Sequence, residues 1–358
     1  MIPQMVPDEQ LSRPVLVVDQ KWKKSVAPVV SVFCLTYNHA HFIRNTIEGF
    51  LSQKTKFPVE IIIHDDASSD GTVEIVREYE GKFPHLINPI YQSKNRFSMG
   101  DELFTKFLLP KARGRYIAVC EGDDYWIDPL KLQKQVDIFN QHPDTIICGA
   151  RAKTWSESKK NFTVTTPALD KDITCMTPKQ LFYLGDWVKN CTRMIPKNLL
   201  LSIPAEYMMD YRHVHFILAK NPAGAFRCLD EVVAVYREHS GGVFSGAKPI
   251  EVQKGYFESA RLIAKLYDDE RAIIMRENAL HAAKELFLTH SISLLERIFY
   301  IFQYTSLVFR NFSYLGIKRA FDRLIYRISI YLDRFPVLKT RLQYFYEFLE
   351  NSNQHPKK

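Results

Sequence analysis

The sequence lacks several features that would assign it to a common protein class. Its six cysteines include no Cys-x-x-Cys pair, so we expect no zinc site, and their scattered positions favour a reducing compartment. No apolar signal core follows the first methionine, and no run of about 18 uncharged apolar residues occurs, so we expect neither secretion nor a membrane span. No internal repeat divides the 358 residues, which suit one large domain with additional elements.

The composition allows a large hydrophobic core but gives little support for nucleic-acid binding. Hydrophobic residues make up 46% of the chain and charged residues 25%, which is typical of a folded domain. The net charge of +8 suits anionic partners. Because the basic residues do not form one tract, the charge alone does not indicate nucleic acid, and we expect no nucleic-acid partner.

The stretch 116–129, YIAVCEGDDYWIDP, joins a short apolar run to three acidic residues. The run has the length and composition of a buried strand, so Glu121, Asp123 and Asp124 would lie at its carboxyl end. Open α/β sheets bind ligands at that end of their strands. Adjacent carboxylates repel one another unless a cation lies between them, and a divalent metal that carries phosphates meets this need. The alternative is a charged turn in which Asp128 caps the next helix.

Residues 29–150 alternate between strand-like and helix-like patterns. The predicted strands are 29–36, 59–64, 86–92, 116–120 and 145–150. The predicted helices are 39–53, 72–82, 98–112 and 131–141. This alternation predicts a mostly parallel sheet with right-handed crossovers. Three strands end in polar residues that would meet at one edge of the sheet. These residues are Tyr37-Asn38, Asp65-Asp66 and 121–124.

The second half of the domain is less regular. We expect a strand at 190–195, a short helix at 196–203, an amphipathic helix that begins at Asp210, and a pair of strands within 224–235. Asp210 would therefore be either a helix cap or a chemical group. The segment 236–243, YREHSGGV, looks like a loop rich in groups that can bind phosphate.

The two ends of the chain differ from this domain. Residues 1–27 are polar and aperiodic, so we expect a flexible arm, and the domain itself would cover 28–250. Long helical patterns fill 251–350, and residues 317–332 alternate basic and apolar side chains. Such a helix would lie on an anionic membrane surface, or else pack on the preceding domain or on a second subunit in a homodimer. Residues 351–358 would form a disordered tail.

Five segments resemble the motifs of family 2 glycosyltransferases with the GT-A fold. They are SVFCLTYNHAHFI, EIIIHDDASSDGT, YIAVCEGDDYWIDPLKLQKQV, DYRHVHFILAK and AVYREHSGG, and they cover about residues 28–245. The resemblance implies an α/β, Rossmann-like fold whose mostly parallel central sheet carries helices on both faces, followed here by the C-terminal helical extension. Because no QxxRW sequence occurs, the chain resembles the non-processive bacterial type that builds cell-surface polysaccharide, and not a polymer synthase.

The resemblance also implies a nucleotide pocket at the first two strand ends. Thr36, Tyr37 and Asn38 would line this pocket, with the Tyr37 ring stacked on the base. Asp66 would contact the base, and Asp65 would lie beside it.

A second set of residues would act on the diphosphate, the metal and the acceptor. Asp123 would contact the diphosphate, and Asp124 would bind Mg²⁺ or Mn²⁺ directly. Arg237 and His239 fall where the family places groups that hold the diphosphate or the metal. Asp210 matches the catalytic base, although a methionine precedes it where Glu or Gly is commoner. Five further histidines are interpreted as structural: His39, His41, His64, His213 and His215.

The function that the resemblance implies is an inverting, metal-assisted glycosyltransferase. It would move a single sugar from a nucleotide-diphosphate sugar, with a UDP-sugar as the expected donor, to a glycan or lipid-linked acceptor in cell-surface polysaccharide synthesis. The expected location is the cytoplasm, peripheral to the inner face of the cell membrane. The alternatives are a non-catalytic nucleotide-sugar-binding or membrane scaffold protein, and a sugar-phosphate nucleotidyltransferase. The latter would need a glycine-rich loop after the first strand, and the segment LTYNHAHF has no glycine.

Overall fold

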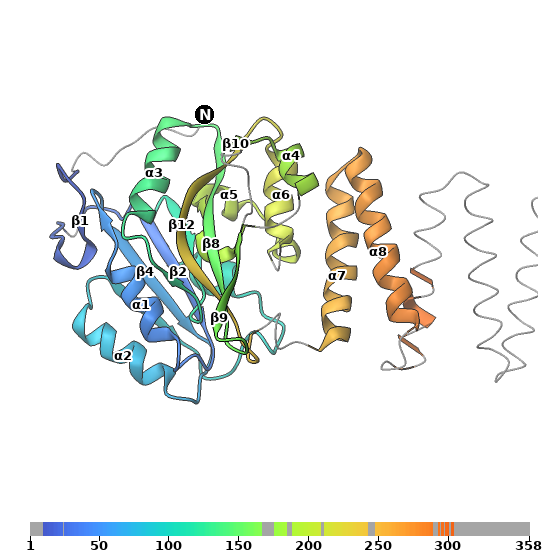
Figure 1. Cartoon of the computed structure of the whole chain (residues 1–358), viewed down its shortest axis with the longest axis horizontal. Coiled ribbons are helices and arrows are strands. Elements are labelled where there is room, and N and C mark those ends of the chain that lie inside the picture. Colours follow the sequence, from blue (N-terminus) through green and yellow to red (C-terminus); the bar gives the residue numbers. More distant parts are fainter. Residues whose placement is uncertain are drawn as a thin grey trace, which may run out of the picture. The chain divides into compact units, whose positions relative to one another are not determined.

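The computed structural model of the chain describes residues 10–23, 25–166, 175–184, 188–208, 211–242, 248–288 and several positions between 293 and 303. Contacts divide the chain into two units. The first comprises Met1–Lys248 and Lys265–Arg271, and the second comprises Pro249–Ala264 and Ala272–Lys358. The first unit contains the sheet and the helices that cover it (Figure 1).

Among the described residues, a ten-stranded sheet forms the centre of the first unit. Its order is β10-β12-β8-β11-β6-β2-β4-β5, with β7 paired to β12 and β9 paired to β8. The strands β2 (Val30–Thr36), β4 (Val59–Asp65), β5 (Ile87–Tyr91) and β6 (Tyr116–Val119) pair in parallel. Every residue of β4 and nearly every residue of β2 is buried, which explains why these strands are almost continuous apolar runs.

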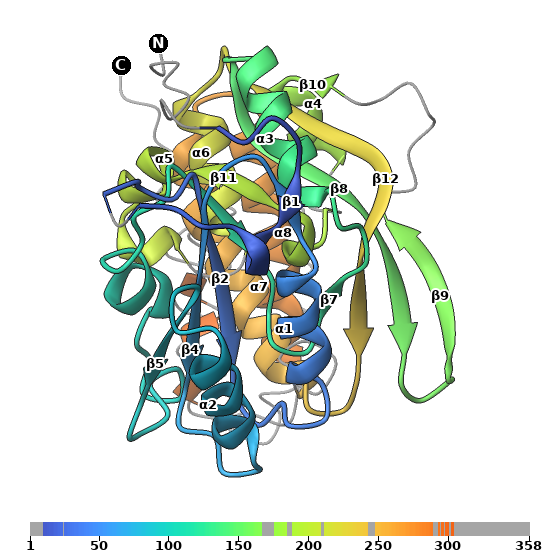
Figure 2. The same ribbon diagram turned by 90° about the vertical axis from the view of Figure 1, so that its left-hand side faces the viewer.

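Helices cover both faces of the sheet. The helices on one face are α1 (Ile43–Leu51), α2 (Thr72–Lys82) and α3 (Lys131–Gln141), and those on the other are α4 (Pro178–Leu184), α5 (Lys197–Leu201) and α6 (Arg212–Lys220) (Figures 1 and 2). The apolar residues Ile43, Ile47 and Phe50 recur at helical spacing along α1, and all three are buried in the same core as β2 and β4. The α/β class and the parallel centre of the sheet are as the sequence predicts. The short elements are η1 (Val17–Asp19), β7 (Tyr125–Trp126), β9 (Asn161–Thr166), β10 (Cys175–Met176), η3 (Asn190–Thr192), β11 (Met194–Pro196), η4 (Ala205–Tyr207) and η5 (Ala264–Leu266).

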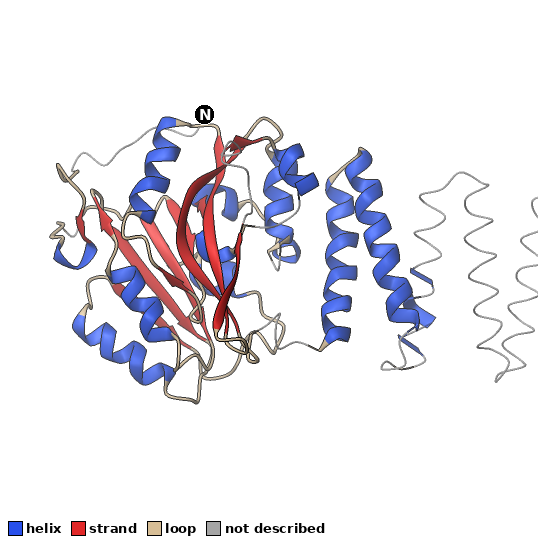
Figure 3. Cartoon of the chain, viewed as in Figure 1, coloured by secondary structure: helices blue, strands red, loops and turns tan. Residues whose placement is uncertain are grey.

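Two long strands, β8 (Thr145–Ser156) and β12 (Ala225–Glu238), extend the sheet (Figure 3). They pair in parallel, with register shifts on both sides of Val232. The sequence predicts two strands within 224–235, and the structure corrects this prediction to one strand with an irregular middle. The charged pair Asp230-Glu231 lies in that irregular part, where a bulge leaves residues unpaired without ending the strand.

The described part of the N-terminal segment is not a loose arm. β1 (Val15–Leu16) pairs with β3 (Lys54–Thr55), and the Val17 side chain is fully buried. The side-chain amide of Gln20 donates a hydrogen bond of 2.8 Å to the Thr55 carbonyl. The buried Val17 side chain and the hydrogen-bonded Gln20 amide therefore hold this segment against the domain, although its composition is polar.

The helix predicted over 98–112 is reduced to one turn with π spacing, η2 (Phe104–Leu108). Gly100 adopts a left-handed φ of +83°, which interrupts a helix at this point. The Glu102 carboxylate then accepts the backbone N–H groups of Phe104 and Thr105 and so begins the turn.

The second unit is helical in its described part. It contains α7 (Pro249–Ile263) and most of α8 (Glu270–Leu288). The rings of Phe257 and Tyr300 pack edge to face with centroids 5.3 Å apart. Within the described residues, no helix has both the length and the apolar character that a membrane crossing needs. The predicted basic helix at 317–332 and the predicted tail at 351–358 lie outside the described residues.

Candidate active site

The polar residues that follow β2, β4 and β6 lie together at one edge of the sheet. Thr36 is the register partner of Asp65 across β2 and β4. The Gly122 N–H donates a hydrogen bond of 2.8 Å to the Leu35 carbonyl, so the loop after β6 follows the end of β2. Neighbouring parallel strands end on the same side of a sheet, and the three predicted groups therefore share one rim.

The loop after β2 leaves Tyr37 open to solvent. Asn38, the next residue, adopts a left-handed φ of +55°. Its N–H donates to Ser68 Oγ and its side-chain oxygen accepts the Ser69 N–H, both at 2.9 Å. These bonds fasten the loop after β2 to the loop after β4. The Tyr37 side chain remains 46% exposed, as a ring that stacks on a base requires.

Asp65 and Asp66 are both buried, and both already bind backbone N–H groups. Asp65 Oδ1 accepts the Ser68 N–H at 2.9 Å, while its Oδ2 has no hydrogen-bond partner in the part of the chain that the structure describes. The two oxygens of Asp66 accept the N–H groups of Arg96 and Phe97 at 2.7 and 2.9 Å. In the structure, Asp66 therefore holds the 96–97 loop, and its contact with a base remains a prediction.

Gly122 allows the loop after β6, here called the acid loop (residues 120–124), to approach the end of β2 closely. A side chain at this position would lie 2.6 Å from Thr36 Oγ1 and 2.9 Å from His39 Nδ1. Both of these buried atoms have no hydrogen-bond partner among the described residues. The close approach, and not a special backbone angle, explains why glycine suits this position.

The Asp123 carboxylate lies beside two imidazole rings. Its Oδ2 is 3.0 Å from His239 Nε2 and 3.8 Å from His39 Nε2. Burial opposes ionisation of Asp123, but the hydrogen bond to His239 and the nearby His39 outweigh burial, so the pKa of this carboxyl lies below its ordinary value. The three ligand atoms lie within 4.8 Å of one another. One carboxylate and two imidazoles at this spacing fit a divalent metal.

Asp124 is placed differently, although it is the adjacent residue. Its side chain is buried, and Oδ1 accepts the Arg237 backbone N–H at 2.8 Å. Burial, followed by the charges of Asp123 and Glu121, raises the pKa of Asp124 well above its ordinary value. Direct metal ligation by Asp124 remains a prediction, whereas the carboxylate that faces the histidines is that of Asp123.

The Arg237 side chain holds the acid loop in place. Its guanidinium lies over the rings of Tyr125 and Phe42, at 4.4 and 5.1 Å from their centroids. Its Nη1 donates a hydrogen bond of 2.7 Å to the Asp123 carbonyl. The diphosphate contact that the sequence assigns to Arg237 remains a prediction.

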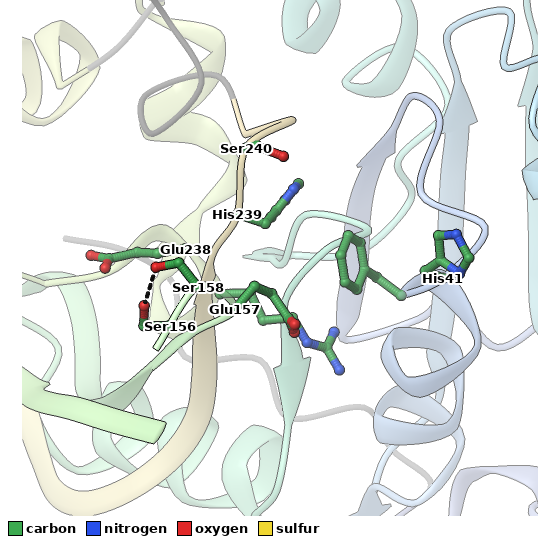
Figure 4. A pocket seen from close by; sticks show the side chains of 9 residues that line it. His41, Ser156, Glu157, Ser158, Glu238, His239 and Ser240 are labelled. Atoms are coloured by element: carbon green, nitrogen blue, oxygen red, sulfur yellow. Dashed lines mark hydrogen bonds between the residues drawn. The ribbon is translucent and has the colours of Figure 1, made fainter. Parts of the chain in front are cut away.

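A cavity of about 960 Å³ opens beside His239 (Figure 4). This volume suits a small molecule of the size of a nucleotide sugar or of an acceptor sugar. Its walls come from the residues before α1, the end of β8 and the end of β12. The lining residues are His41, Phe42, Ser156, Glu157, Ser158, Arg237, Glu238, His239 and Ser240. The carboxylates in this lining can accept hydrogen bonds from sugar hydroxyls, and the serine hydroxyls can both donate and accept them.

Two further residues need comment, one because the structure does not describe it and one because it lies at the site. Asp210, the predicted base, lies outside the described residues, and the described part of the following helix, α6, begins at Arg212. His39, which the sequence analysis interprets as structural, contributes a nitrogen to the cluster at Asp123. A signal for His39 was present, because it follows the same strand end as Tyr37.

Sequence comparisons identify relatives of the domain. Residues 31–202 match the model of glycosyl transferase family 2. An uncharacterized protein of Mycobacterium tuberculosis is 34% identical over 224 residues, which are 61% of this chain and 61% of that protein. The putative teichuronic acid biosynthesis glycosyltransferase TuaG of Bacillus subtilis is 36% identical over 118 residues, or 33% of this chain and 43% of TuaG. The UDP-Glc:alpha-D-GlcNAc-diphosphoundecaprenol beta-1,3-glucosyltransferase WfaP of Escherichia coli is 35% identical over 108 residues, or 30% of this chain and 40% of WfaP. The chain thus spans less than two thirds of the length of these relatives.

Solved structures share the architecture. The crystal structure of S. aureus TarS in complex with UDP-GlcNAc has a TM-score of 0.53 at 19% identity, and the match covers 78% of this chain and 80% of that one. Full TarS gives a TM-score of 0.53 at 18% identity over 80% of this chain and 50% of that one. At such identities the likeness concerns the fold, which is the GT-A arrangement that the sequence predicts.

Proposed function

Because residues 31–202 belong to glycosyl transferase family 2, we propose that the chain transfers a single sugar from a nucleotide-diphosphate sugar to a glycan or lipid-linked acceptor. The proposed donor is a UDP-sugar, and the proposed pathway is cell-surface polysaccharide synthesis at the cytoplasmic face of the membrane. The activity of WfaP and the pathway named for TuaG support both choices. The observation that supports the proposal is that the ends of β2, β4 and β6 share one rim, at which Asp123 and two histidines cluster.

The metal-side residues would assist the leaving group. In an inverting transfer, the acceptor attacks the anomeric carbon from the side opposite the diphosphate, which gains negative charge as its bond breaks. A divalent metal, when bound, would neutralise part of that charge. We propose that Asp123 and His239 hold Mg²⁺ or Mn²⁺, because their ligand atoms lie 3.0 Å apart next to the cavity. Arg237 would keep the acid loop in this position through its bonds to Asp124 and to the Asp123 carbonyl.

The acceptor side of the reaction needs a base and a binding surface. The hydroxyl that attacks must lose its proton, and we propose Asp210 for this role on the basis of its motif. The cavity beside His239 would receive the transferred sugar and the acceptor, because Glu157, Ser158 and Glu238 offer partners for sugar hydroxyls.

A donor screen tests the proposal. The full chain is incubated with UDP-, GDP- and dTDP-sugars in the presence of Mn²⁺ or Mg²⁺, and release of the free nucleotide is measured. We expect one UDP-sugar to be turned over, slowly with water alone and faster with a lipid-linked glycan acceptor. Binding of UDP without turnover of any donor would favour a non-catalytic sugar-nucleotide-binding protein, and binding of no nucleotide would refute the proposal.

The role of Asp210 leads to the first specific prediction. Asp210→Asn should lower turnover by about 100- to 10,000-fold, because a positioned base typically contributes this much. Donor affinity, measured by calorimetry with UDP, should stay within about twofold, since the base contacts the acceptor and not the nucleotide. Unchanged turnover would remove Asp210 from the mechanism and leave the donor assignment intact.

A further inference from the structure

We propose that His39 is a third protein ligand of the divalent metal, beside Asp123 and His239, and that this second imidazole makes the site prefer Mn²⁺ to Mg²⁺. The inference rests on the proposed function in one respect, namely that the acid loop binds a metal. It gives His39, which the sequence leads us to expect as structural, the role of a metal ligand.

The three ligands come from three separate parts of the chain. His39 follows β2, Asp123 follows β6, and His239 follows β12, and their ligand atoms lie within 4.8 Å of one another. Two ligands at right angles around an octahedral ion, with bonds of about 2.1 Å, stand about 3 Å apart. The Asp123–His239 distance of 3.0 Å already has this value, and the Asp123–His39 distance of 3.8 Å is within 1 Å of it. A small closing movement would therefore complete the set.

The His39 ring is held in place without help from Asp123. Its backbone N–H donates a hydrogen bond of 2.9 Å to Thr72 Oγ1 at the start of α2. The Phe42 ring lies against both imidazoles, with its centroid 6.3 Å from that of His39 and 4.7 Å from that of His239. The side chains of His39, Asp123 and His239 are 14%, 17% and 10% exposed. The ligands are thus preorganised, and so little conformational entropy is lost when an ion binds.

The two ring nitrogens of His39 point to different tasks. Nε2 faces Asp123 Oδ2 at 3.8 Å, which is too long for a hydrogen bond. Nδ1 is buried and has no hydrogen-bond partner among the described residues. It shares the space beside Gly122 with the hydroxyl of Thr36, which also has no partner there. An ion at Nε2, with the proton on Nδ1, would give Nε2 the close partner that Asp123 at 3.8 Å does not supply.

The donor set determines which ion is preferred. Mg²⁺ takes oxygen ligands and keeps several waters, whereas imidazole nitrogen suits transition metals. Mn²⁺ shares the preference of Mg²⁺ for carboxylate oxygen, but as a first-row transition metal it tolerates imidazole ligands better than Mg²⁺ does, although less well than the later metals of the row. Three protein ligands would leave three octahedral positions for diphosphate oxygens or water. Two imidazoles and one carboxylate therefore favour Mn²⁺ over Mg²⁺.

Calorimetric titration of the full chain with Mn²⁺ alone and with Mg²⁺ alone tests this assignment. His39→Gln replaces the imidazole by an amide and should weaken Mn²⁺ binding by about tenfold or more, because even outer partners of metal ligands contribute about 10- to 100-fold. Mg²⁺ binding should change by less than about threefold, since the amide offers an oxygen. His85→Gln is the matched control, because His85 is an exposed histidine in the turn before β5. Unchanged Mn²⁺ affinity in His39→Gln, or equal losses for both ions, would overturn the inference.

A spectroscopic measurement on the unmodified chain avoids any effect of the substitution on folding. Pulsed electron paramagnetic resonance of bound Mn²⁺, with ¹⁵N-labelled histidine, should show nitrogen couplings from two imidazoles. Couplings from one imidazole would overturn the role of His39 and leave the proposed glycosyl transfer untouched. The donor screen decides the latter independently.

Discussion

Two pairs of carboxylates lie at the rim and are held in different ways. Asp65 and Asp66, after β4, form what is here called the nucleotide side, and Asp123 and Asp124, after β6, form the metal side. On the nucleotide side, the partners are backbone N–H groups of nearby loops. Asp65 binds the N–H of Ser68, three residues further along the chain, and Asp66 binds those of Arg96 and Phe97. These bonds fix the loops around the proposed base site with contacts that need only β4 and β5 to be in place.

On the metal side, the partners come from the far end of the domain. Asp123 meets His239, which is 116 residues away, and Asp124 binds the N–H of Arg237, which is 113 residues away. The metal side therefore forms only when β12 has reached the edge of the sheet. The comparison predicts that each side can be weakened without the other, except in the loop after β2, where a change would affect both because His39 follows Tyr37 and Asn38 there.

The largest effect in the comparison is expected when the Asp123 carboxylate, which faces both histidines, is removed. Asp123→Asn should lower turnover by about 100- to 1,000-fold, the size expected when a group that stabilises transition-state charge is lost. UDP affinity in the absence of metal should stay within about twofold, because the nucleotide side keeps its own bonds. Turnover and UDP calorimetry check both expectations.

Asp124→Asn is the matched variant for this test. The Asp124 Oδ1 accepts the Arg237 backbone N–H, and an amide oxygen can accept the same bond, so Asp124→Asn should reduce turnover less than Asp123→Asn does. A larger loss in Asp124→Asn than in Asp123→Asn would restore Asp124 as the direct metal ligand, as the sequence resemblance predicts.

A substitution at Gly122, where the loop after β6 meets the end of β2, should lower both the stability and the affinity for metal. Gly122→Ala would place a methyl group 2.6 Å from Thr36 Oγ1 and 2.9 Å from His39 Nδ1, so the acid loop must move. We expect a loss of about 1–3 kcal/mol in the free energy of unfolding, as for overpacked cores, together with weaker Mn²⁺ binding. Urea denaturation and Mn²⁺ titration measure the two effects.

The control for this substitution is Gly81→Ala in α2, where an added methyl group meets no atom within 4 Å. It should leave metal binding unchanged and stabilise the helix by up to about 1 kcal/mol. Equal behaviour of the two variants would mean that the close approach at Gly122 has no consequence.

The smallest expected effect belongs to the nucleotide side. In Asp66→Asn, the amide nitrogen would face one of the two N–H donors of Arg96 and Phe97, so one hydrogen bond is lost. The free energy of unfolding should fall by about 1–2 kcal/mol, and the affinity for UDP should fall with it. Mn²⁺ affinity should not change, and a loss of Mn²⁺ binding here would show that the two sides are not separable.

Much of this arrangement could be predicted from the sequence. The helices 72–82 and 131–141 have the predicted bounds, because their apolar spacing is regular. The strands β2 and β4 match their apolar runs within one residue. The strand pair predicted within 224–235 was wrong, because charged residues at a bulge resemble a turn. The helix predicted over 98–112 was too long, because periodicity does not reveal the left-handed turn at Gly100.

By itself, the sequence determined the α/β class, the resemblance to family 2 glycosyltransferases and the rim on which the acidic residues lie, since strand ends and short motifs are local properties. Only the tertiary structure decided which carboxylate meets which histidine. Asp123 and Asp124 are neighbours in the chain, yet one faces two imidazoles and the other a backbone N–H. The physical reason is that the partners of both carboxylates come from β12 and the residue that follows it, more than a hundred residues away in the chain.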